Sequence, residues 1–288
     1  MRTAPRLEAV GSGRTLSLCA DDYGLSPGVC RGILELVAAR RLSAVSCLVG
    51  RDAWREHASA LTAEAAVLDG QVQLGLHFNL TEGRPLSPEL CSSWPQFPSL
   101  QRLMASAFLR ALPRAPLQLE WQAQVEAFTD AAGRLPDFID GHQHVHHLAG
   151  VRETVLEGAA GLSARAGRRV AVRATGRLPG AGFALKRALI AGTGGRTLQR
   201  RLEQRGIAHN RCLFGVYDFQ SADYRALMQA WLASLPTSGA LLFCHPGHAD
   251  DGIGDPIAPA RERELAYLRG TGFAEDLAAA GVRLGPAW

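Results

Sequence analysis

The stretch Arg14-Thr-Leu-Ser-Leu-Cys-Ala20, followed directly by Asp21-Asp22, decides the fold. Polar and apolar residues alternate at its start, which predicts a β-strand. Ser26-Pro27 then has the residues of a helix start, a capping serine and a proline in the first turn. Apolar residues recur at helical spacing from Val29 to Val37. A strand, a short polar turn and an amphipathic helix thus form a first β/α unit.

The same alternation of short apolar segments and longer amphipathic segments continues along the chain. We expect strands at residues 14–20, 43–49, 72–77, 138–140, 170–173, 212–216, 240–244 and 282–284. We expect helices at residues 27–41, 52–68, 100–112, 117–132, 151–166, 222–235, 259–269 and 274–280. Residues 81–100 are expected to form a long loop, and residues 175–211 to contain helical pieces.

Strands that alternate with helices of a dozen residues or more indicate βαβ units and a parallel sheet. We therefore expect an α/β fold of one domain, an irregular (β/α) TIM-like barrel at residues 14–288, preceded by a flexible N-terminus at residues 1–13. A doubly wound open sheet is the alternative. Neither the glycine pattern of dinucleotide-binding folds nor that of P-loops follows the first strand, which disfavours both kinds of site.

Composition excludes several classes of protein. The 288 residues are 47% hydrophobic and 20% charged, which excludes intrinsic disorder and collagen. The chain contains no run of eighteen apolar residues, so we expect no membrane span. Residues 1–14 lack the apolar segment of a signal peptide. The net charge is +4, but its basic residues are spread out, so we expect no nucleic-acid partner. Six cysteines without a CxxC pair indicate reduced thiols and a cytoplasmic protein.

Polar side chains gather where the predicted strands end. They are Asp21-Asp22, His77, Asp140-Gly-His-Gln-His-Val-His-His147, Arg173 and His245-Pro-Gly-His248. In a (β/α) barrel or an open parallel sheet, the carboxyl ends of the strands lie on one face. We therefore expect these side chains to converge on one pocket.

A carboxylate and two imidazoles are a typical set of three ligands for a divalent metal, with a position left open for water and substrate. A second carboxylate can act as general base, and a further histidine can protonate a leaving group. If the histidine segment is extended, His142, His144 and His146 point to one side.

Each group also has a plain structural interpretation. The aspartate pair fits a helix-capping turn, and His77 fits a hydrogen-bonded core histidine. The histidine cluster fits a surface tract, Arg173 a surface charge and residues 245–247 a simple turn.

Four segments resemble the YdjC-like carbohydrate deacetylases. They are Cys19 to Ile33, Gly75 to Leu86, Phe138 to His146 and Phe243 to Gly247, and a tail of similar pattern has Asp255-Pro256 and Arg261 to Leu265. The resemblance spans about Leu16 to Leu284. Cys19 stands where the family usually has asparagine, and Gly141 where it often has serine.

This resemblance implies a (β/α) barrel that removes the N-acetyl group from an amino sugar of the N-acetylglucosamine type. It implies one divalent metal ion, Zn²⁺ or Mg²⁺, held by Asp22, His77 and His142. The implied partner is an N-acetylated carbohydrate, and the resemblance also suggests a homodimer.

The resemblance further implies roles for three other residues. Asp21 matches the catalytic base, His245 matches the second catalytic histidine and is the candidate acid, and Arg173 matches an arginine near the site that would stabilise the transition state. Two other functions stay open. One is a metal-dependent phosphoesterase on a similar barrel, and the other is a non-catalytic sugar- or metal-binding protein, which would need no base beside the metal.

Overall fold

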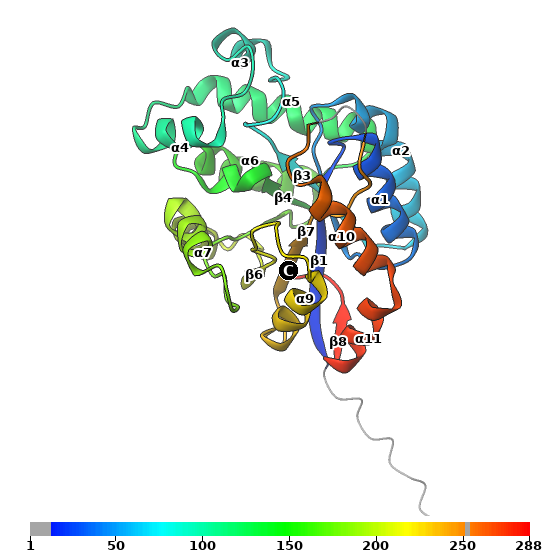
Figure 1. Ribbon diagram of the computed structural model, residues 1–288. Coiled ribbons are helices and arrows are strands. Elements are labelled where there is room, and N and C mark those ends of the chain that lie inside the picture. Colours follow the sequence, from blue (N-terminus) through cyan, green and yellow to red (C-terminus); the bar gives the residue numbers. More distant parts are fainter. Residues whose placement is uncertain (1–12, 251–253) are drawn as a thin grey trace, which may run out of the picture.

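Strand β1 (Arg14–Tyr23) is an inner strand of the sheet and pairs with three other strands (Figure 1). The computed structural model describes residues 13–250 and 254–288, so the predicted flexible N-terminus lies outside the described residues except for Gly13. Every strand pair is parallel. The strands are β1 (Arg14–Tyr23), β2 (Ala44–Cys47), β3 (Gln73–Phe78), β4 (Phe138–Gly141), β5 (Ala171–Val172), β6 (Cys212–Phe214), β7 (Ala240–Cys244) and β8 (Val282–Leu284).

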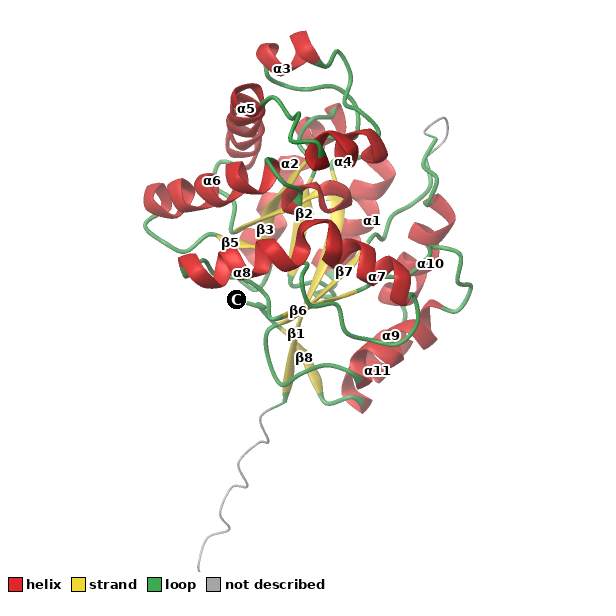
Figure 2. Ribbon diagram, turned by 90° about the vertical axis from the view of Figure 1, so that its left-hand side faces the viewer, coloured by secondary structure: helices red, strands yellow, loops and turns green. Residues whose placement is uncertain are grey.

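Helices follow the strands and surround the sheet (Figure 2). The α-helices are α1 (Pro27–Ala38), α2 (Asp52–Val67), α3 (Pro88–Ser93), α4 (Leu100–Phe108), α5 (Arg114–Ala132), α6 (Val151–Ala166), α7 (Ala184–Ile190), α8 (Arg196–Arg205), α9 (Tyr224–Ala233), α10 (Ala258–Arg269) and α11 (Thr271–Ala279). Two irregular segments, the 3₁₀ turns η1 (His142–His147) and the π-turn η2 (Ala191–Gly195), complete the set. Within the described residues, no helix is long and apolar enough to cross a lipid bilayer.

The strand order is β5-β4-β3-β2-β1-β7-β6, with β8 beside β1. This is the cyclic order of a barrel, because β1 and β7 are neighbours and the other strands follow in sequence. The expected α/β fold with a parallel sheet is confirmed. Closure of the barrel is not confirmed, because no strand pairing joins β5 to β6 in the part of the chain that the structure describes. The seven strands from β5 to β6 in this order form a half-barrel.

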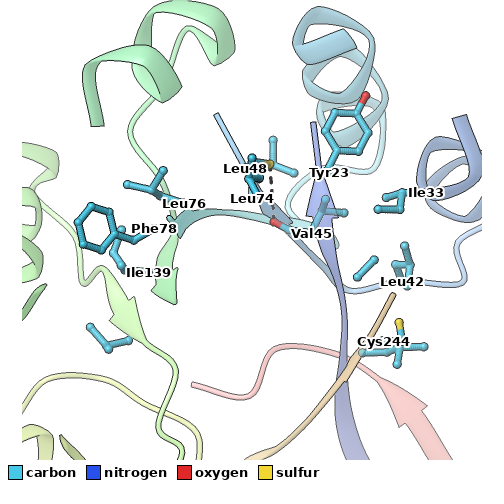
Figure 3. Packing of buried hydrophobic residues seen from close by; sticks show 14 of the residues in the cluster. Tyr23, Ile33, Leu42, Val45, Leu48, Leu74, Leu76, Phe78, Ile139 and Cys244 are labelled. Carbon is cyan, nitrogen blue, oxygen red and sulfur yellow. Dashed lines mark hydrogen bonds between the residues drawn. The ribbon is translucent and has the colours of Figure 1, made fainter. Parts of the chain in front are cut away.

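The core explains why the strands are apolar on both faces. Helices pack outside the sheet and side chains fill its inner side, so a parallel strand has little contact with water. All five residues of β7 are buried, as are all residues of β1 from Leu16 onwards. Figure 3 shows the resulting packing, in which Ile33 of α1 lies among side chains of the sheet such as Val45 and Leu74.

One segment differs from expectation, and one that the sequence left without exact bounds agrees with it. The expected loop at residues 81–100 contains α3, which begins after Ser87, whose side chain accepts a hydrogen bond from the Leu90 N–H. The helical pieces expected at residues 175–211 are present as α7, η2 and α8. Helix α7 has no buried residue, so no apolar face marks it in the sequence.

Candidate active site

A bulge in β1 brings two consecutive carboxylates into one network. Neighbouring residues of a regular strand point to opposite faces. Here the pairing of β1 with β2 shifts register between Ala20 and Tyr23, and Asp22 has a left-handed backbone with φ of 71°. Aspartate tolerates this conformation better than most residues. Asp21 and Asp22 are both buried at the carboxyl end of β1, as the sequence predicted.

Asp22, His77 and His142 come together from three strand ends. The Asp22 Oδ1 atom lies 3.3 Å from His77 Nε2 and 2.9 Å from His142 Nδ1. One ligand atom from each residue lies within 4.8 Å of the others, and all three residues are buried. One carboxylate and two imidazoles suit a divalent cation such as Zn²⁺. The donor set therefore fits the metal that the sequence implied.

Arg261, which the sequence analysis did not assign to the site, keeps Asp22 charged. Its buried guanidinium donates to Asp22 Oδ2 at 2.8 Å and to Asp255 at 2.5 Å. Burial raises the pKa of the Asp22 carboxyl, but Arg261 and His142 lower it more, so it lies well below its usual range. The only sequence signal for Arg261 is its place in the Arg261–Leu265 segment.

Asp140 orients His77, although the sequence analysis gave it no role. Its Oδ1 lies 2.7 Å from His77 Nδ1, and the Ser46 hydroxyl contacts both side chains. A carboxylate behind a histidine is the usual arrangement around metal-binding imidazoles. Burial lowers the pKa of His77, but Asp140 and Asp22 raise it to about 10. Because a ligating imidazole must be neutral, binding a cation would displace this proton.

Arg173 holds Asp21 in place. The guanidinium is fully buried and donates from Nη1 to Asp21 Oδ2 at 2.7 Å and from Nη2 to Asp21 Oδ1 at 2.6 Å. Such paired hydrogen bonds fix a carboxylate firmly and leave each oxygen a further lone pair. This burial favours a positioning role for Arg173 over the direct contact with a transition state that the resemblance implied.

Cys19, Asp21 and Asp140 form a second group close enough to hold a cation. Arg173 Nη2 contacts all three, at 3.2 Å from Cys19 Sγ, 2.6 Å from Asp21 and 2.5 Å from Asp140. The guanidinium therefore supplies the positive charge at this position. Of the two groups, we therefore take only the Asp22 group as the candidate metal site.

His245 follows β7, on the same face of the sheet. Its ring lies edge-on to Phe219 and Phe243, with centroids 5.2 and 5.5 Å apart. Burial lowers the pKa of His245 to about 4, although Asp22 and Asp21 oppose this shift. The imidazole is therefore neutral at pH 7, and acting as a general acid requires that it gain a proton during the reaction.

Glu264, another residue that the sequence analysis missed, anchors the segment after β7. Its carboxylate accepts a hydrogen bond from the backbone N–H of His245 at 2.5 Å and one from the Tyr217 hydroxyl at 2.5 Å. Burial raises the pKa of Glu264 from 4.5 to about 7, although both hydrogen bonds lower it. The fold therefore favours the protonated acid.

We expect Glu264→Gln to change how stability depends on pH. The stabilisation from protonated Glu264 is complete below pH 4.5 and is lost as the pH rises through 7. Glutamine has the shape of the protonated acid and cannot ionise. The variant should therefore lie within about 1 kcal/mol of the wild type near pH 5 and exceed its free energy of unfolding by roughly 3 kcal/mol at pH 8. Urea unfolding at both pH values measures this, with the exposed Glu275→Gln as control. An equal difference at both pH values would contradict the assignment.

The histidine segment is not extended, so the condition under which His142, His144 and His146 would point to one side is not met. The chain folds into η1, with left-handed φ values of 51° at Gln143 and 62° at His144. The turn folds back over Gly141, where a Cβ would lie 2.8 Å from the backbone nitrogen of His146. His146 instead bonds through Nε2 to the Arg173 carbonyl at 2.9 Å.

These observations define an α/β half-barrel protein with a candidate divalent-metal site at the carboxyl ends of its strands. The chain belongs to the family of YdjC-like proteins, whose model matches residues 15–279. The family resemblance seen in the sequence is thus confirmed.

Curated proteins that are similar in sequence to this chain include two that are named as deacetylases. The carbohydrate deacetylase of Mus musculus is 35% identical over 148 residues, which cover 49% of this chain and 46% of the relative. The chitooligosaccharide deacetylase of Proteus mirabilis is 36% identical over 145 residues, which cover 48% of this chain and 52% of the relative. The aligned part thus spans about half the length of the curated relatives.

A solved structure shows the same fold. It is that of an Enterococcus faecalis protein provisionally named a cellobiose-phosphate cleavage protein, with a TM-score of 0.68 and 21% sequence identity. The match covers 96% of this chain and 98% of that chain. At this identity the likeness concerns the fold alone.

Proposed function

We propose that this protein is a metal-dependent carbohydrate deacetylase that hydrolyses the N-acetyl group of an amino sugar of the N-acetylglucosamine type. The observation that carries the proposal is the buried Asp22–His77–His142 cluster with the carboxylate of Asp21 beside it in the sequence. The names of the relatives, carbohydrate deacetylase and chitooligosaccharide deacetylase, support the substrate class.

In this proposal Asp22, His77 and His142 hold one divalent ion. Two imidazoles favour Zn²⁺, whereas a carboxylate and water also suit Mg²⁺. When bound, such an ion polarises the acetyl carbonyl and lowers the pKa of a water molecule. Arg261 contributes by keeping Asp22 anionic, and Asp140 by fixing the ring of His77.

Asp21 and His245 move the protons. The Asp21 carboxylate takes a proton from the attacking water, whose oxygen forms a bond to the acetyl carbon. His245, which is neutral at rest, gains a proton from solvent during the reaction. The carbon–nitrogen bond then breaks, the departing amine takes this proton from His245, and the proton that Asp21 took from the water passes to solvent. Arg173 keeps the Asp21 carboxylate in one orientation throughout, because it holds both oxygens. The products are acetate and a free amino sugar.

A release assay separates this function from its alternatives. The protein is incubated with N-acetylglucosamine and its oligomers and with phosphorylated sugars, in the presence of Zn²⁺ or Mg²⁺. We expect acetate and free amine in equal amounts and no phosphate. Phosphate without acetate would instead support a phosphoesterase, and sugar binding without either product would support a non-catalytic binding protein.

A cytoplasmic location is part of the proposal. All six cysteines are unpaired, which fits a reducing compartment. The homodimer suggested by the family resemblance stays a prediction that light scattering of the purified protein can test.

A further inference from the structure

One histidine of the motif at residues 142–147 has neither a part in the proposed reaction nor a hydrogen-bond partner among the described residues. His146 and His147 have hydrogen-bond partners, since His146 bonds the Arg173 carbonyl and His147 bonds the hydroxyls of Thr175 and Thr193. His144 makes no hydrogen bond to any described residue, and its Nδ1 is a buried atom without a partner. We propose that His144 is a specificity residue that donates a hydrogen bond from Nε2 to a sugar oxygen near the acetamido group of the substrate.

The aromatic contacts of His144 place it at the candidate active site. Its ring lies edge-on to Phe243, with centroids 5.3 Å apart and planes at 90°. Phe243 is also edge-on to His245, with centroids 5.5 Å apart, and the guanidinium of Arg173 lies 5.8 Å from the centre of the same ring. His144 and His245 therefore contact one phenyl ring, which the guanidinium that holds Asp21 also contacts.

The backbone supports a role for this position. Gln143 and His144 are consecutive non-glycine residues in the left-handed region, with φ of 51° and 62°. Such conformations are costly and persist where the surroundings hold them, often next to ligands. This local turn directs His144 to Phe243, while His142, two residues earlier, lies in the cluster with Asp22.

The two ring nitrogens of His144 have different surroundings. Nδ1 is buried without a partner, whereas Nε2 is not among the buried unpartnered atoms of the described residues. In a neutral ring the hydrogen resides on Nε2, because a buried N–H without an acceptor is more costly than a buried lone pair. In a charged ring both nitrogens carry hydrogen. Nε2 is therefore a donor in either state.

The ligand chemistry follows from this donor and its neighbours. An N–H at the accessible nitrogen requires an oxygen acceptor, and the hydroxyl and glycosidic oxygens of a sugar supply several. His245, which we propose to protonate the amine, packs against the same Phe243 ring as His144. The acceptor is therefore a sugar oxygen close to the acetamido group. This assignment rests on the proposed function for the identity of the substrate.

The test compares His144→Phe and His144→Gln with the wild type on N,N′-diacetylchitobiose. Phenylalanine keeps a ring against Phe243 but removes the donor, and we expect KM to rise about 3- to 10-fold with kcat within about 2-fold. Glutamine keeps an N–H donor and should restore part of the loss. Metal content and melting temperature should stay at wild-type values, and His57→Phe serves as the control for replacing a histidine elsewhere.

Two results would overturn the proposal. An unchanged KM in His144→Phe would show that the ring makes no contact with the sugar. A fall in kcat together with loss of metal, without rescue by His144→Gln, would show a structural role. If the wild type releases no acetate, calorimetric binding of N,N′-diacetylchitobiose replaces kinetics. Weaker binding by His144→Phe then supports the contact even though the deacetylase proposal fails, and equal binding refutes it.

Discussion

Replacing Asp21 with asparagine is expected to lower kcat for acetate release by about 10²–10⁴-fold, the range typical for loss of a general base. The amide cannot accept a proton from water, although it occupies the same space as the carboxylate. Bound metal should stay at the wild-type level, because the donor atoms of Asp22, His77 and His142 are unchanged. Steady-state kinetics and elemental analysis of the same preparation measure both effects.

The fold should survive this change. Arg173 loses one charged partner but keeps its contact with Asp140 at 2.5 Å, so the buried guanidinium is not left unpaired. Thermal unfolding monitored by circular dichroism is the control for folding. If Asp21→Asn is folded and metal-loaded and still turns over every acetylated substrate at the wild-type rate, Asp21 is not the base.

His142→Ala is expected to remove the bound metal and, with it, the activity. In the proposed ligand set, drawn from the described residues, His142 is one of three protein ligands, so its loss would leave Asp22 and His77 with too few donors to retain a cation through dialysis. The metal-to-protein ratio should fall from about one to near zero, as measured by elemental analysis. His57→Ala, on helix α2 and outside the cluster, is the matched control and should keep its metal. Undiminished metal content in His142→Ala would refute the ligand set.

Much of the fold could be predicted from the sequence because its strands are short and apolar and its helices amphipathic. Residues such as Leu16 and Leu242 are buried within the sheet, so the pattern reports burial directly. Closure of the barrel could not be predicted in the same way. Strands β5 and β6 have only two and three residues, and pairing at such short ends depends on loops that carry no periodic pattern.

The positions of the candidate site residues were predictable where a motif supplied the residue type. Asp21, Asp22, His77, His142 and His245 all lie at strand ends, as parallel topology requires. Their partners were missed, because an arginine such as Arg261 on α10 has the sequence appearance of an ordinary charged helix residue. Only the folded structure shows that this arginine is buried against a carboxylate 239 positions away.

Two local backbone conformations also could not be predicted from the sequence pattern. The bulge at Asp22 and the turn at Gln143 and His144 depend on left-handed conformations that non-glycine residues adopt only when their surroundings enforce them. A period of two residues assumes regular strand geometry, so it does not apply to the folded histidine segment.

The most direct test of the account is a metal titration of the protein after chelation, with acetate release from N,N′-diacetylchitobiose as the measurement. The account predicts no release from the metal-free protein. Release should rise in proportion to added Zn²⁺ or Mg²⁺ and reach its plateau once one bound equivalent per chain fills the site of Asp22, His77 and His142. Acetate release at the full rate from protein shown by elemental analysis to be metal-free would contradict it.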